Sequence, residues 1–337
     1  MSLPTRPLGK TGVDITRVGF GAWAVGGGGW AFSWGPQDDA QSVDAIRHAV
    51  DAGVNWVDTA PGYGLGHSEE VVARALRDIP AADRPYVFTK CGLRWDPADP
   101  YKPSRRIGAP ASLREEVEQS LRRLEVDVID LYQMHWPAED GTPLESYWST
   151  LLQLKDEGKI RAAALCNHNA AQLDAAEKLG HVESLQPPFS AVKRTAAPDI
   201  AWCAAHGTGV VVYSPMQAGL LAGEFSAERV ASLHPDDWRK RNPEFQGERL
   251  THNLALAASL RGLADEKGTT LPAIAVAWAA AWPGVTAAIV GARSALQVDG
   301  WLPAATLELS AADIEQVASA ISSTGAGDGP VRAAAGS

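Results

Sequence analysis

Short apolar runs rich in β-branched residues alternate along the chain with longer segments in which apolar residues recur every three or four positions. The short runs are typical of buried strands, and the longer segments are typical of amphipathic helices. Strands that alternate with helices in this way form a parallel sheet whose strands are joined by crossover helices. The predicted strands cover residues 17–20, 55–58, 86–90, 128–134, 160–166, 184–186, 209–213 and 286–290.

The helical segments complete a repeating unit of strand and helix. They cover residues 38–52, 68–76, 111–124, 143–157, 170–179, 199–206, 252–267 and 271–281, with one more helix that begins near Ser294. Glycines at positions 53, 158, 180 and 207 stand where helices should end. Eight such units favour an α/β fold of the closed (β/α)8 TIM barrel type over an open sheet, because closure leaves no strand at an edge.

Further segments lie outside the repeating units. Residues 6–15 predict an N-terminal β-hairpin that plugs one barrel mouth, the alternative being an unstructured end. Ser310 is a polar cap for an extra C-terminal helix. The long connection 220–247 either contacts substrate or cofactor at the barrel mouth or is an insertion without a role. We expect a single domain over residues 1–323 and a disordered tail, rich in Gly and Ala, over residues 324–337.

Composition narrows the class of protein. Hydrophobic residues make up 45% of the chain and charged residues 21%, which is enough to build a large core and too little charge for a disordered coil. The formal net charge of -10 repels a nucleic-acid backbone and an anionic membrane surface, although a local basic pocket is compatible with it. We therefore expect no nucleic-acid and no membrane partner.

Targeting signals and cysteine pairs are also missing from the sequence. The longest apolar stretch, residues 271–282, contains Pro272 and is much shorter than the roughly 20 residues that span a bilayer. The first residues lack the apolar core of a signal peptide. Cys91, Cys166 and Cys203 are far apart and odd in number, so neither a disulfide framework nor a zinc site is indicated. A cytoplasmic protein without a metal is the simplest expectation.

Polar residues follow consecutive predicted strands. Asp58, Lys90 and His135 each close an apolar run, and Tyr63 follows Asp58 in a Gly-rich turn. Catalytic groups of barrel enzymes collect at these strand ends. Taken singly, such an Asp is often a helix cap and such a His is often structural. Together, the four residues predict one catalytic site over the barrel mouth.

The residue types suggest acid catalysis. A buried Lys near a Tyr hydroxyl stabilises the phenolate and is expected to lower the Tyr63 pKa from near 10 by roughly 1 to 3 units. Such a phenol can protonate a developing alkoxide, while Asp58 orients Lys90 and His135 bonds the same oxygen. Because no member of the set is set up as a nucleophile and the chain has no hydride donor, carbonyl reduction with a bound hydride cofactor suits it.

The motifs resemble one known family. The run at residues 58–70, with Phe-Thr-Lys at 88–90, Met-His at 134–135 and Tyr-Ser-Pro-Met at 213–216, is similar to the aldo-keto reductase superfamily over about residues 6–302. Residues 26–30 and 64–69 look most like its bacterial branch of inositol-operon and general-stress reductases. The resemblance implies that NADPH binds across the C-terminal mouth without a Rossmann domain. The chain agrees, because neither of its Gly-rich turns forms a strand-Gly-x-Gly-x-x-Gly-helix unit.

The resemblance also implies roles for individual residues. Tyr63 corresponds to the general acid, Lys90 and Asp58 to its tuning pair, and His135 to the residue that orients the substrate. Asn167 and Gln186 correspond to a clamp on the nicotinamide carboxamide, Tyr213 to the stacking ring, and Arg293 to the partner of a 2′-phosphate. The implied cofactor-binding set is Gly21, Ala22, Trp23, Asp58, Cys166, Asn167, Gln186, Tyr213, Ser214, Pro215, Met216, Gly219, Leu221, Gly291, Ala292, Arg293 and Gln297.

Three positions depart from the family pattern. Cys166 stands where relatives usually have Ser, which costs a hydrogen bond to the carboxamide. Trp301 stands where relatives often have an Asn near the adenine, and Phe189 where many have Tyr. NADPH is therefore the expected cofactor, and NADH is not excluded.

Tryptophan is abundant, with 12 in the chain. Those expected in loops after strands predict an aromatic-walled substrate pocket that suits aldehydes or the flat face of a sugar. The alternative is that they pack against the top of the barrel. The predicted pocket residues are Trp23, Trp30, Trp34, Trp95 and Trp136.

The leading hypothesis is thus NADPH-dependent, reversible reduction of aldehydes or ketones, with a small carbonyl compound or sugar as substrate. One alternative is a nicotinamide-binding sensor or regulatory subunit, as in the similar potassium-channel β subunits. Another is a Schiff-base lyase that uses Lys90. A metal hydrolase is disfavoured because no His-x-His ends the first strand. The physiological substrate, the reaction direction and the oligomeric state stay open.

Overall fold

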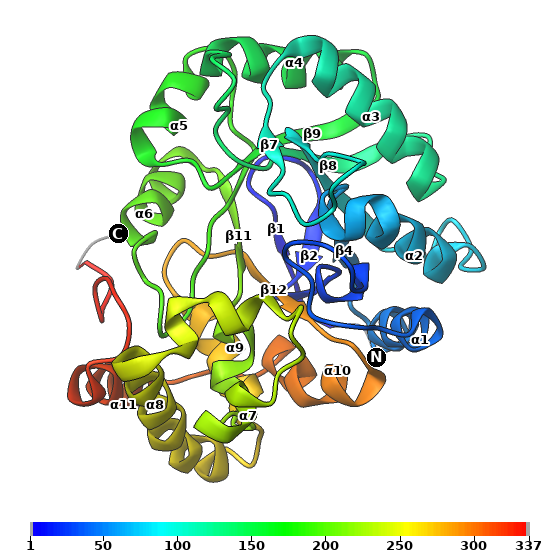
Figure 1. Ribbon diagram of the computed structural model, residues 1–337. Helices are drawn as coiled ribbons and strands as arrows, with labels where there is room; N and C mark the ends of the chain where they lie inside the picture. The colour runs from blue at the N-terminus through cyan, green and yellow to red at the C-terminus, as the bar shows by residue number, and fades with distance from the viewer. Residues whose placement is uncertain (1–2, 335–337) are drawn as a thin grey trace.

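Eight parallel strands close into a barrel in the computed structural model, which describes residues 3–334 (Figure 1). Each predicted strand is present within one residue of its expected ends, and the closed barrel confirms the (β/α)8 prediction. In barrel order from the first, the strands are β3 (Val18–Gly21), β4 (Trp56–Asp58), β5 (Tyr86–Cys91), β8 (Ile129–Met134), β9 (Ile160–Cys166), β10 (Ser184–Gln186), β11 (Gly209–Tyr213) and β12 (Ala287–Gly291).

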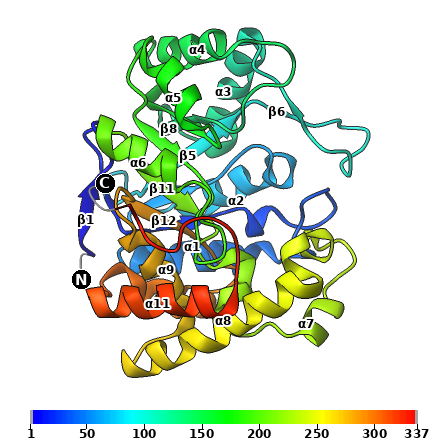
Figure 2. The ribbon, with the colours of Figure 1, turned by 90° about the vertical axis from the view of Figure 1, so that its left-hand side faces the viewer.

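The helices form a ring outside the strands. None within residues 3–334 is both long and apolar enough to cross a membrane. Helices α8 (Gly247–Glu266) and α11 (Ala311–Thr324) pack against each other along one side (Figure 2). The helices are α1 (Asp39–Asp51), α2 (His67–Leu76), α3 (Pro110–Leu124), α4 (Leu144–Asp156), α5 (Ala170–Glu177), α6 (Ala197–His206), α7 (Ala227–Ala231), α8 (Gly247–Glu266), α9 (Leu271–Ala281), α10 (Ala295–Trp301) and α11 (Ala311–Thr324).

The barrel interior is apolar at the amino ends of the strands and polar at their carboxyl ends. Trp56, Phe88 and Leu131 lie in one buried apolar cluster inside β4, β5 and β8. Side chains alternate between the two faces of a strand. The residues two positions further along are Asp58, Lys90 and Gln133, which are also buried. The same alternation therefore places apolar side chains inside the amino end of the barrel and polar side chains together at its carboxyl end, which we call the polar mouth.

The predicted N-terminal hairpin plugs the opposite mouth. Its strands β1 (Thr5–Pro7) and β2 (Asp14–Thr16) pair antiparallel. Leu8, Val13 and Ile15 are buried in the same cluster as Trp56. In Figure 2, β1 lies at one edge of the molecule, while β6 (Leu93–Arg94) and α7 project at the other. The plug and the polar mouth thus lie at opposite ends of the barrel.

Two short features at the polar mouth were not predicted. Strand β6 pairs with β7 (Arg105–Arg106) in a small hairpin after β5. The connection 220–247 contains α7 and a 3₁₀ turn at Trp238–Arg241. Strands of two residues and single helical turns carry no periodic pattern, so the sequence gives no signal for them.

The expected disordered tail is wrong for residues 324–334. Thr324 ends α11, and the following residues pack on the barrel, with Ala326 buried. The amide of Asp328 donates to the carbonyl of Val192 at 3.0 Å, and the buried guanidinium of Arg194 donates to the carbonyls of residues 326, 329 and 330. Backbone hydrogen bonds to a buried arginine order a segment whose composition alone suggests disorder. Residues 335–337 lie outside the described residues.

Candidate functional site

A buried ion pair lies at the centre of the polar mouth. Lys90 Nζ is 2.5 Å from Asp58 Oδ1 and donates to the Thr59 carbonyl at 2.8 Å. Both side chains are almost fully inaccessible to solvent. Burial disfavours the ammonium, but the charge of the Asp58 carboxylate and its hydrogen bond raise the pKa of Lys90 above its ordinary value. A fixed, desolvated positive charge therefore stands at the end of β5.

Tyr63 and His135 flank this charge. Tyr63 begins the turn Tyr63–Gly66 between β4 and α2, and Lys90 Nζ lies 5.0 Å from the centre of its ring. The His135 ring meets the Tyr63 ring edge-on, with centroids 5.8 Å apart. The structure thus brings together the four residues that the strand ends predicted.

The protonation of these groups follows burial more than charge. Burial raises the pKa of Tyr63 to about 12, although the Lys90 charge acts to lower it. The predicted net depression of this pKa is therefore wrong, because desolvation of the phenolate outweighs the attraction of the ammonium. Burial, with the charges of Lys90 and Arg106, holds the pKa of His135 well below its ordinary value. At neutral pH the site presents a protonated phenol and a neutral imidazole.

Two glycines let the Tyr63 turn touch the loop after β3. A Cβ on Gly26 would lie 2.9 Å from the Tyr63 carbonyl carbon, and one on Gly64 would lie 2.0 Å from the Gly26 oxygen. Gly64 also has φ +62°, which disfavours other residues. The close crossing of these two backbones fixes where the Tyr63 ring enters the mouth.

The second oxygen of Asp58 is bound by two buried amides. Gln186 Nε2 donates to Asp58 Oδ2 at 2.8 Å, and Gln133 Nε2 donates to it at 3.2 Å. Gln133 was not among the predicted site residues. Its position two residues before His135 on an inward-facing strand pattern was a signal that could have found it.

The residues predicted to clamp a carboxamide, Asn167 and Gln186, lie at the ends of neighbouring strands and donate to protein groups. Asn167, at φ +58°, donates from Nδ2 to the His135 carbonyl at 2.9 Å and accepts from the Tyr213 hydroxyl at 2.9 Å. Cys166 Sγ contacts Gln133 Oε1 at 3.6 Å. Within residues 3–334, Gln186 Oε1 has no protein donor. The acceptor Gln186 Oε1 fits a ligand with an amide group whose N–H can donate to it.

Arg293 is held by a loop. Its Nε donates to Gln37 Oε1 at 2.5 Å, and its other nitrogens donate to the carbonyls of Trp34 and Pro36. Its amide donates to Gln297 Oε1 at 2.8 Å. The guanidinium predicted to bind a 2′-phosphate therefore ties the end of β12 to residues 34–37.

The remaining predicted cofactor residues line the strand ends near these groups. Gly291 pairs in register with Gly21 at the ends of β12 and β3. The segment after β11 curls through left-handed conformations at Ser214 and Gly219. The remaining residues of the predicted set, Ala22, Trp23, Pro215, Met216, Leu221 and Ala292, belong to the same three loops.

Two of the family departures lie in the core. Trp301 is buried among the helices, and Phe189 stacks on Trp278 at 5.8 Å between ring centres. Both rings therefore pack within the core.

Tryptophans wall the mouth beside Tyr63, although not all the predicted ones. The Trp23 ring stacks on Tyr63 at 6.1 Å and on Trp238 at 5.0 Å, and Trp34 meets Trp23 edge-on at 5.1 Å. We call Trp23, Trp34 and Trp238 the tryptophan cluster. Trp238 was missed because it lies in the irregular 220–247 connection.

The other predicted pocket tryptophans make different contacts. Trp30 bonds the Gly27 carbonyl within its own loop, and Trp136 packs under the guanidinium of Arg106. No ring contact joins Trp95 to the tryptophan cluster among the described residues. The aromatic wall is therefore smaller than predicted and comes partly from another loop.

Two loops hold the tryptophan cluster closed. The Trp238 amide donates to the Ser33 carbonyl at 3.1 Å, and Arg241 donates to the Ala31 carbonyl at 2.6 Å. The Arg239 guanidinium lies 4.6 Å above the Trp34 ring. Residues 27–38 and 233–241 thus form a joined cover over one side of the mouth.

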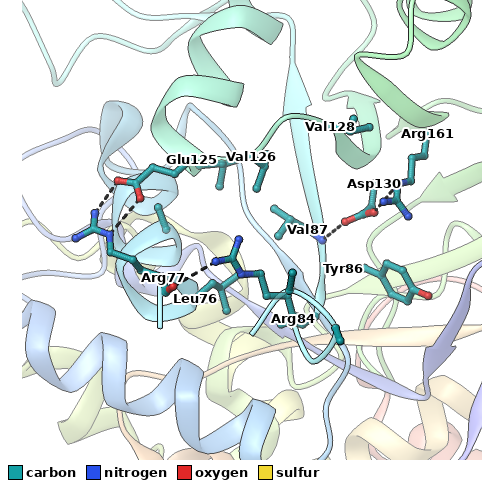
Figure 3. Close-up of a pocket in the computed structure, with 15 residues that line it drawn as sticks. Leu76, Arg77, Arg84, Tyr86, Val87, Glu125, Val126, Val128, Asp130 and Arg161 are labelled. Atoms are coloured by element: carbon teal, nitrogen blue, oxygen red, sulfur yellow. Dashed lines mark hydrogen bonds and ion pairs between the residues drawn. The ribbon is translucent and has the colours of Figure 1, made fainter. Parts of the chain in front are cut away.

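A separate cavity of about 340 Å³ lies at the other end of the barrel (Figure 3). It is bounded by the ends of α2 and α3 and the starts of β5 and β8. Arg77 forms an ion pair with Glu125. Asp130 accepts a hydrogen bond from the Val87 amide and forms an ion pair with Arg161. Arg84 donates to the carbonyls of Ile79 and Arg77, and the cavity contains none of the predicted site residues. Within residues 3–334 no group of three or more His, Cys, Asp or Glu side chains is placed to hold a metal ion.

Comparisons with known proteins agree with this geometry. A model of the Aldo/keto reductase family matches residues 17–322. Aldo-keto reductase YhdN of Bacillus subtilis is 33% identical over 294 residues, 87% of this chain and 86% of that protein. The NADH-specific methylglyoxal reductase of Escherichia coli is 33% identical over 319 residues, 91% of this chain and 95% of that protein.

A solved structure shows the same architecture. The glycerol dehydrogenase AKR11B4 from Gluconobacter oxydans has a TM-score of 0.86 at 35% identity, with 98% of each chain covered. The family match spans the barrel and all four clustered residues, and the relatives are bacterial, in keeping with the predicted branch. The protein is an NAD(P)H-dependent oxidoreductase acting on carbonyl groups, and it belongs to the aldo/keto reductase family.

Proposed function

We propose that the protein reduces aldehydes or ketones to alcohols, reversibly, with NADPH as cofactor and with Tyr63 as the proton donor. The observation that carries the proposal is the position of the Tyr63 ring, 5.0 Å from the buried Lys90 ammonium and edge-on to the His135 ring. A phenol whose pKa is about 12 is fully protonated at neutral pH and is ready to donate. The site therefore suits an oxygen that gains negative charge during the reaction.

The chain's own residues handle the proton and the charge. Bound reduced nicotinamide supplies the hydride that adds to the carbonyl carbon. Tyr63 and His135 donate hydrogen bonds to the carbonyl oxygen, and the Tyr63 proton passes to that oxygen as its charge develops, which yields the alcohol. The Lys90 ammonium stabilises the phenolate left on Tyr63, and Asp58 holds Lys90 in place.

The cofactor is proposed to lie across the strand ends. Gln186 Oε1 would accept a carboxamide N–H, with Asn167 and Cys166 beside it, and the Tyr213 ring would stack on the nicotinamide. Arg293 would leave the carbonyls of residues 34 and 36 to bind a 2′-phosphate. NADH is the alternative, supported by the name of the Escherichia coli relative.

The reading of Lys90 as a Schiff-base nucleophile is less well supported. A nucleophilic lysine must lose its proton near neutral pH. The Lys90 ammonium instead has two close acceptors, the Asp58 carboxylate and the Thr59 carbonyl, and its pKa is raised. These contacts favour a charged, non-nucleophilic lysine.

Loss of the reduced-nicotinamide absorbance tests the proposal. The purified protein is mixed with NADPH or NADH and a panel that includes methylglyoxal, glyceraldehyde, aromatic aldehydes, sugars and quinones. We expect Tyr63→Phe to bind cofactor as tightly as the parent and to lower turnover by about 10²- to 10⁴-fold. Tyr86→Phe, a half-buried tyrosine at the opposite end of the barrel, is the matched control.

Turnover and cofactor binding together distinguish a reductase from a regulatory subunit. Parental turnover in Tyr63→Phe contradicts the acid role. Tight cofactor binding by the parent, without turnover on any carbonyl compound, instead supports a sensor or regulatory subunit.

A further inference from the structure

Gln133 lies inside the barrel in direct contact with the ion-pair carboxylate. It is fully buried, and its register partner on the neighbouring strand is Lys90. Its Nε2 donates to Asp58 Oδ2 at 3.2 Å, and its Oε1 accepts from Gln186 Nε2 at 3.1 Å. A polar side chain at this depth is costly unless both ends are bonded. Here both ends are bonded, the nitrogen to Asp58 and the oxygen to Gln186 and to Cys166 Sγ, which donates at 3.6 Å.

The amide can take only one orientation in this position. Gln186 donates to Gln133 Oε1, so the amide nitrogen of Gln133 must face Asp58. The reverse orientation would set the amide oxygen against the carboxylate and an N–H group against the Gln186 donor. The contact therefore requires a group that donates at one end and accepts at the other.

This contact completes the coordination of the Asp58 carboxylate. One oxygen, Oδ1, accepts from Lys90, and the other, Oδ2, accepts from Gln133 and Gln186. With both oxygens held, the plane of the carboxylate is fixed and Oδ1 stays directed at the Lys90 ammonium. Lys90 in turn lies 5.0 Å from the centre of the Tyr63 ring.

We propose that Gln133 is a positioning residue for carbonyl reduction: it holds the Asp58 carboxylate in the orientation that keeps Lys90 against the Tyr63 phenol. The inference rests on the proposed role of Tyr63 as the acid. Gln133 acts through Asp58 and does not touch the substrate. Its second bond, to Gln186, joins the acid side of the site to the proposed carboxamide side.

Two substitutions test the proposal. Gln133→Leu keeps the volume and removes the donor, and we expect kcat to fall about 10- to 100-fold, as for loss of a hydrogen bond to a charged group. The KM for the carbonyl compound should change less than about 3-fold, since Gln133 makes no substrate contact. Gln119→Leu, on the exposed side of α3, is the control.

Gln133→Glu gives a readout that a merely structural role would not produce. A neutral carboxyl can donate to Asp58 and accept from Gln186, whereas an ionised one repels Asp58. The buried carboxyl beside Asp58 should be neutral at low pH. We therefore expect turnover within about 3-fold of the parent near pH 6 and a fall as the pH rises, over a range in which the parent is flat because Tyr63 stays protonated and His135 stays neutral.

The outcomes are distinguishable. Failure of the parent to reduce any carbonyl compound removes the proposed function itself. If the parent turns over and Gln133→Leu matches it in kcat, or if Gln133→Glu follows the parental pH profile, the positioning role is overturned. Should Gln133→Leu fail to fold, the pH profile of Gln133→Glu decides the question, and Gln133→Met, which also lacks a donor, replaces the leucine variant in the kcat comparison.

Discussion

At the residue scale, buried carboxyls near the mouth differ in how they are held. Asp58 is neutralised by Lys90, but Glu116 on α3 is buried without an equally close cation. Glu116 accepts from the Gly92 amide and from Ser112 Oγ, both at 2.8 Å. Burial nevertheless raises the pKa of Glu116 to about 7, against the effect of these two bonds. The loop after β5 is thus anchored to a carboxyl that titrates near neutral pH.

This titration predicts a pH dependence of stability. The folded pKa of Glu116 lies above its ordinary value of 4.5, so the folded state binds the proton more tightly than the unfolded state does. Protonated Glu116 therefore makes its full contribution to the free energy of unfolding below about pH 4.5, and this contribution is lost as the pH rises to about 7. Glu116→Gln can accept from the Gly92 amide with its oxygen and donate to Ser112 Oγ with its nitrogen. It should be more stable than the parent at pH 8, by on the order of 2–3 kcal/mol.

Urea unfolding at several pH values measures this effect. The difference between parent and Glu116→Gln should grow between pH 4.5 and 7 and then level off. Glu115→Gln, a more exposed neighbour, should run parallel to the parent. If the free energy of unfolding changed with pH by the same amount in all three proteins, Glu116 would not titrate in this range.

Residue types at strand ends were sufficient to predict Asp58, Tyr63, Lys90 and His135. Their protonation was not predictable, because the burial of Tyr63 depends on the loops that carry Trp23 and Gly26. The sequence shows that a Lys and a Tyr are close. It does not show how much water remains between them.

At the element scale, the joined cover of residues 27–38 and 233–241 connects Arg293, at the end of β12, to the tryptophan cluster beside Tyr63. Arg293 holds one end of the first loop through the carbonyls of residues 34 and 36, and Arg241 holds the same loop from the second. Regular strands and helices were predicted well because their periodicity is local. This cover was not, since its contacts join residues about 200 positions apart and follow no repeat.

Substitution of Arg293 distinguishes its proposed contact with a 2′-phosphate from its contact with the loop at residues 34–37. If Arg293 binds a 2′-phosphate, Arg293→Ala should lower kcat/KM for NADPH by about 10- to 100-fold and change that for NADH less than 3-fold, because only NADPH loses a charge-assisted bond. Steady-state kinetics with each cofactor give the ratio. Arg241→Ala, which loosens the same loop without facing the phosphate, is the control. Equal losses with both cofactors would assign Arg293 a role in loop closure alone.

At the scale of the whole molecule, the apolar plug and the polar mouth lie at opposite ends of the barrel. The hairpin closes the amino end with Leu8 and Ile15, which are 1% and 0% exposed. The polar mouth at the other end carries the buried ion pair and the glycine crossing. The plug and the barrel could be predicted from periodicity, but the packed segment 325–334 could not, because a buried Arg194 gives no signal in sequence.

This separation predicts that the plug can be weakened without loss of chemistry. Leu8→Ala should reduce the free energy of unfolding by about 2–5 kcal/mol, as for a large-to-small change in a core. The kcat of the folded enzyme should stay within about 2-fold of the parent. Urea unfolding and initial rates, with exposed Thr5→Ala as control, check both expectations. A parallel loss of kcat would mean that the two ends are coupled through the barrel.

The tryptophan cluster has an optical consequence. Indoles in van der Waals contact share their excited states, and the sign and size of the resulting circular-dichroism couplet depend on the angle between the rings. Trp23 and Trp34 come from one loop and Trp238 from the other, and the Trp238 ring is inclined at 26° to the Trp23 ring and at 81° to the Trp34 ring. Parting of the two loops would decouple these transitions, so the protein carries an intrinsic chromophore that reports when its mouth is open.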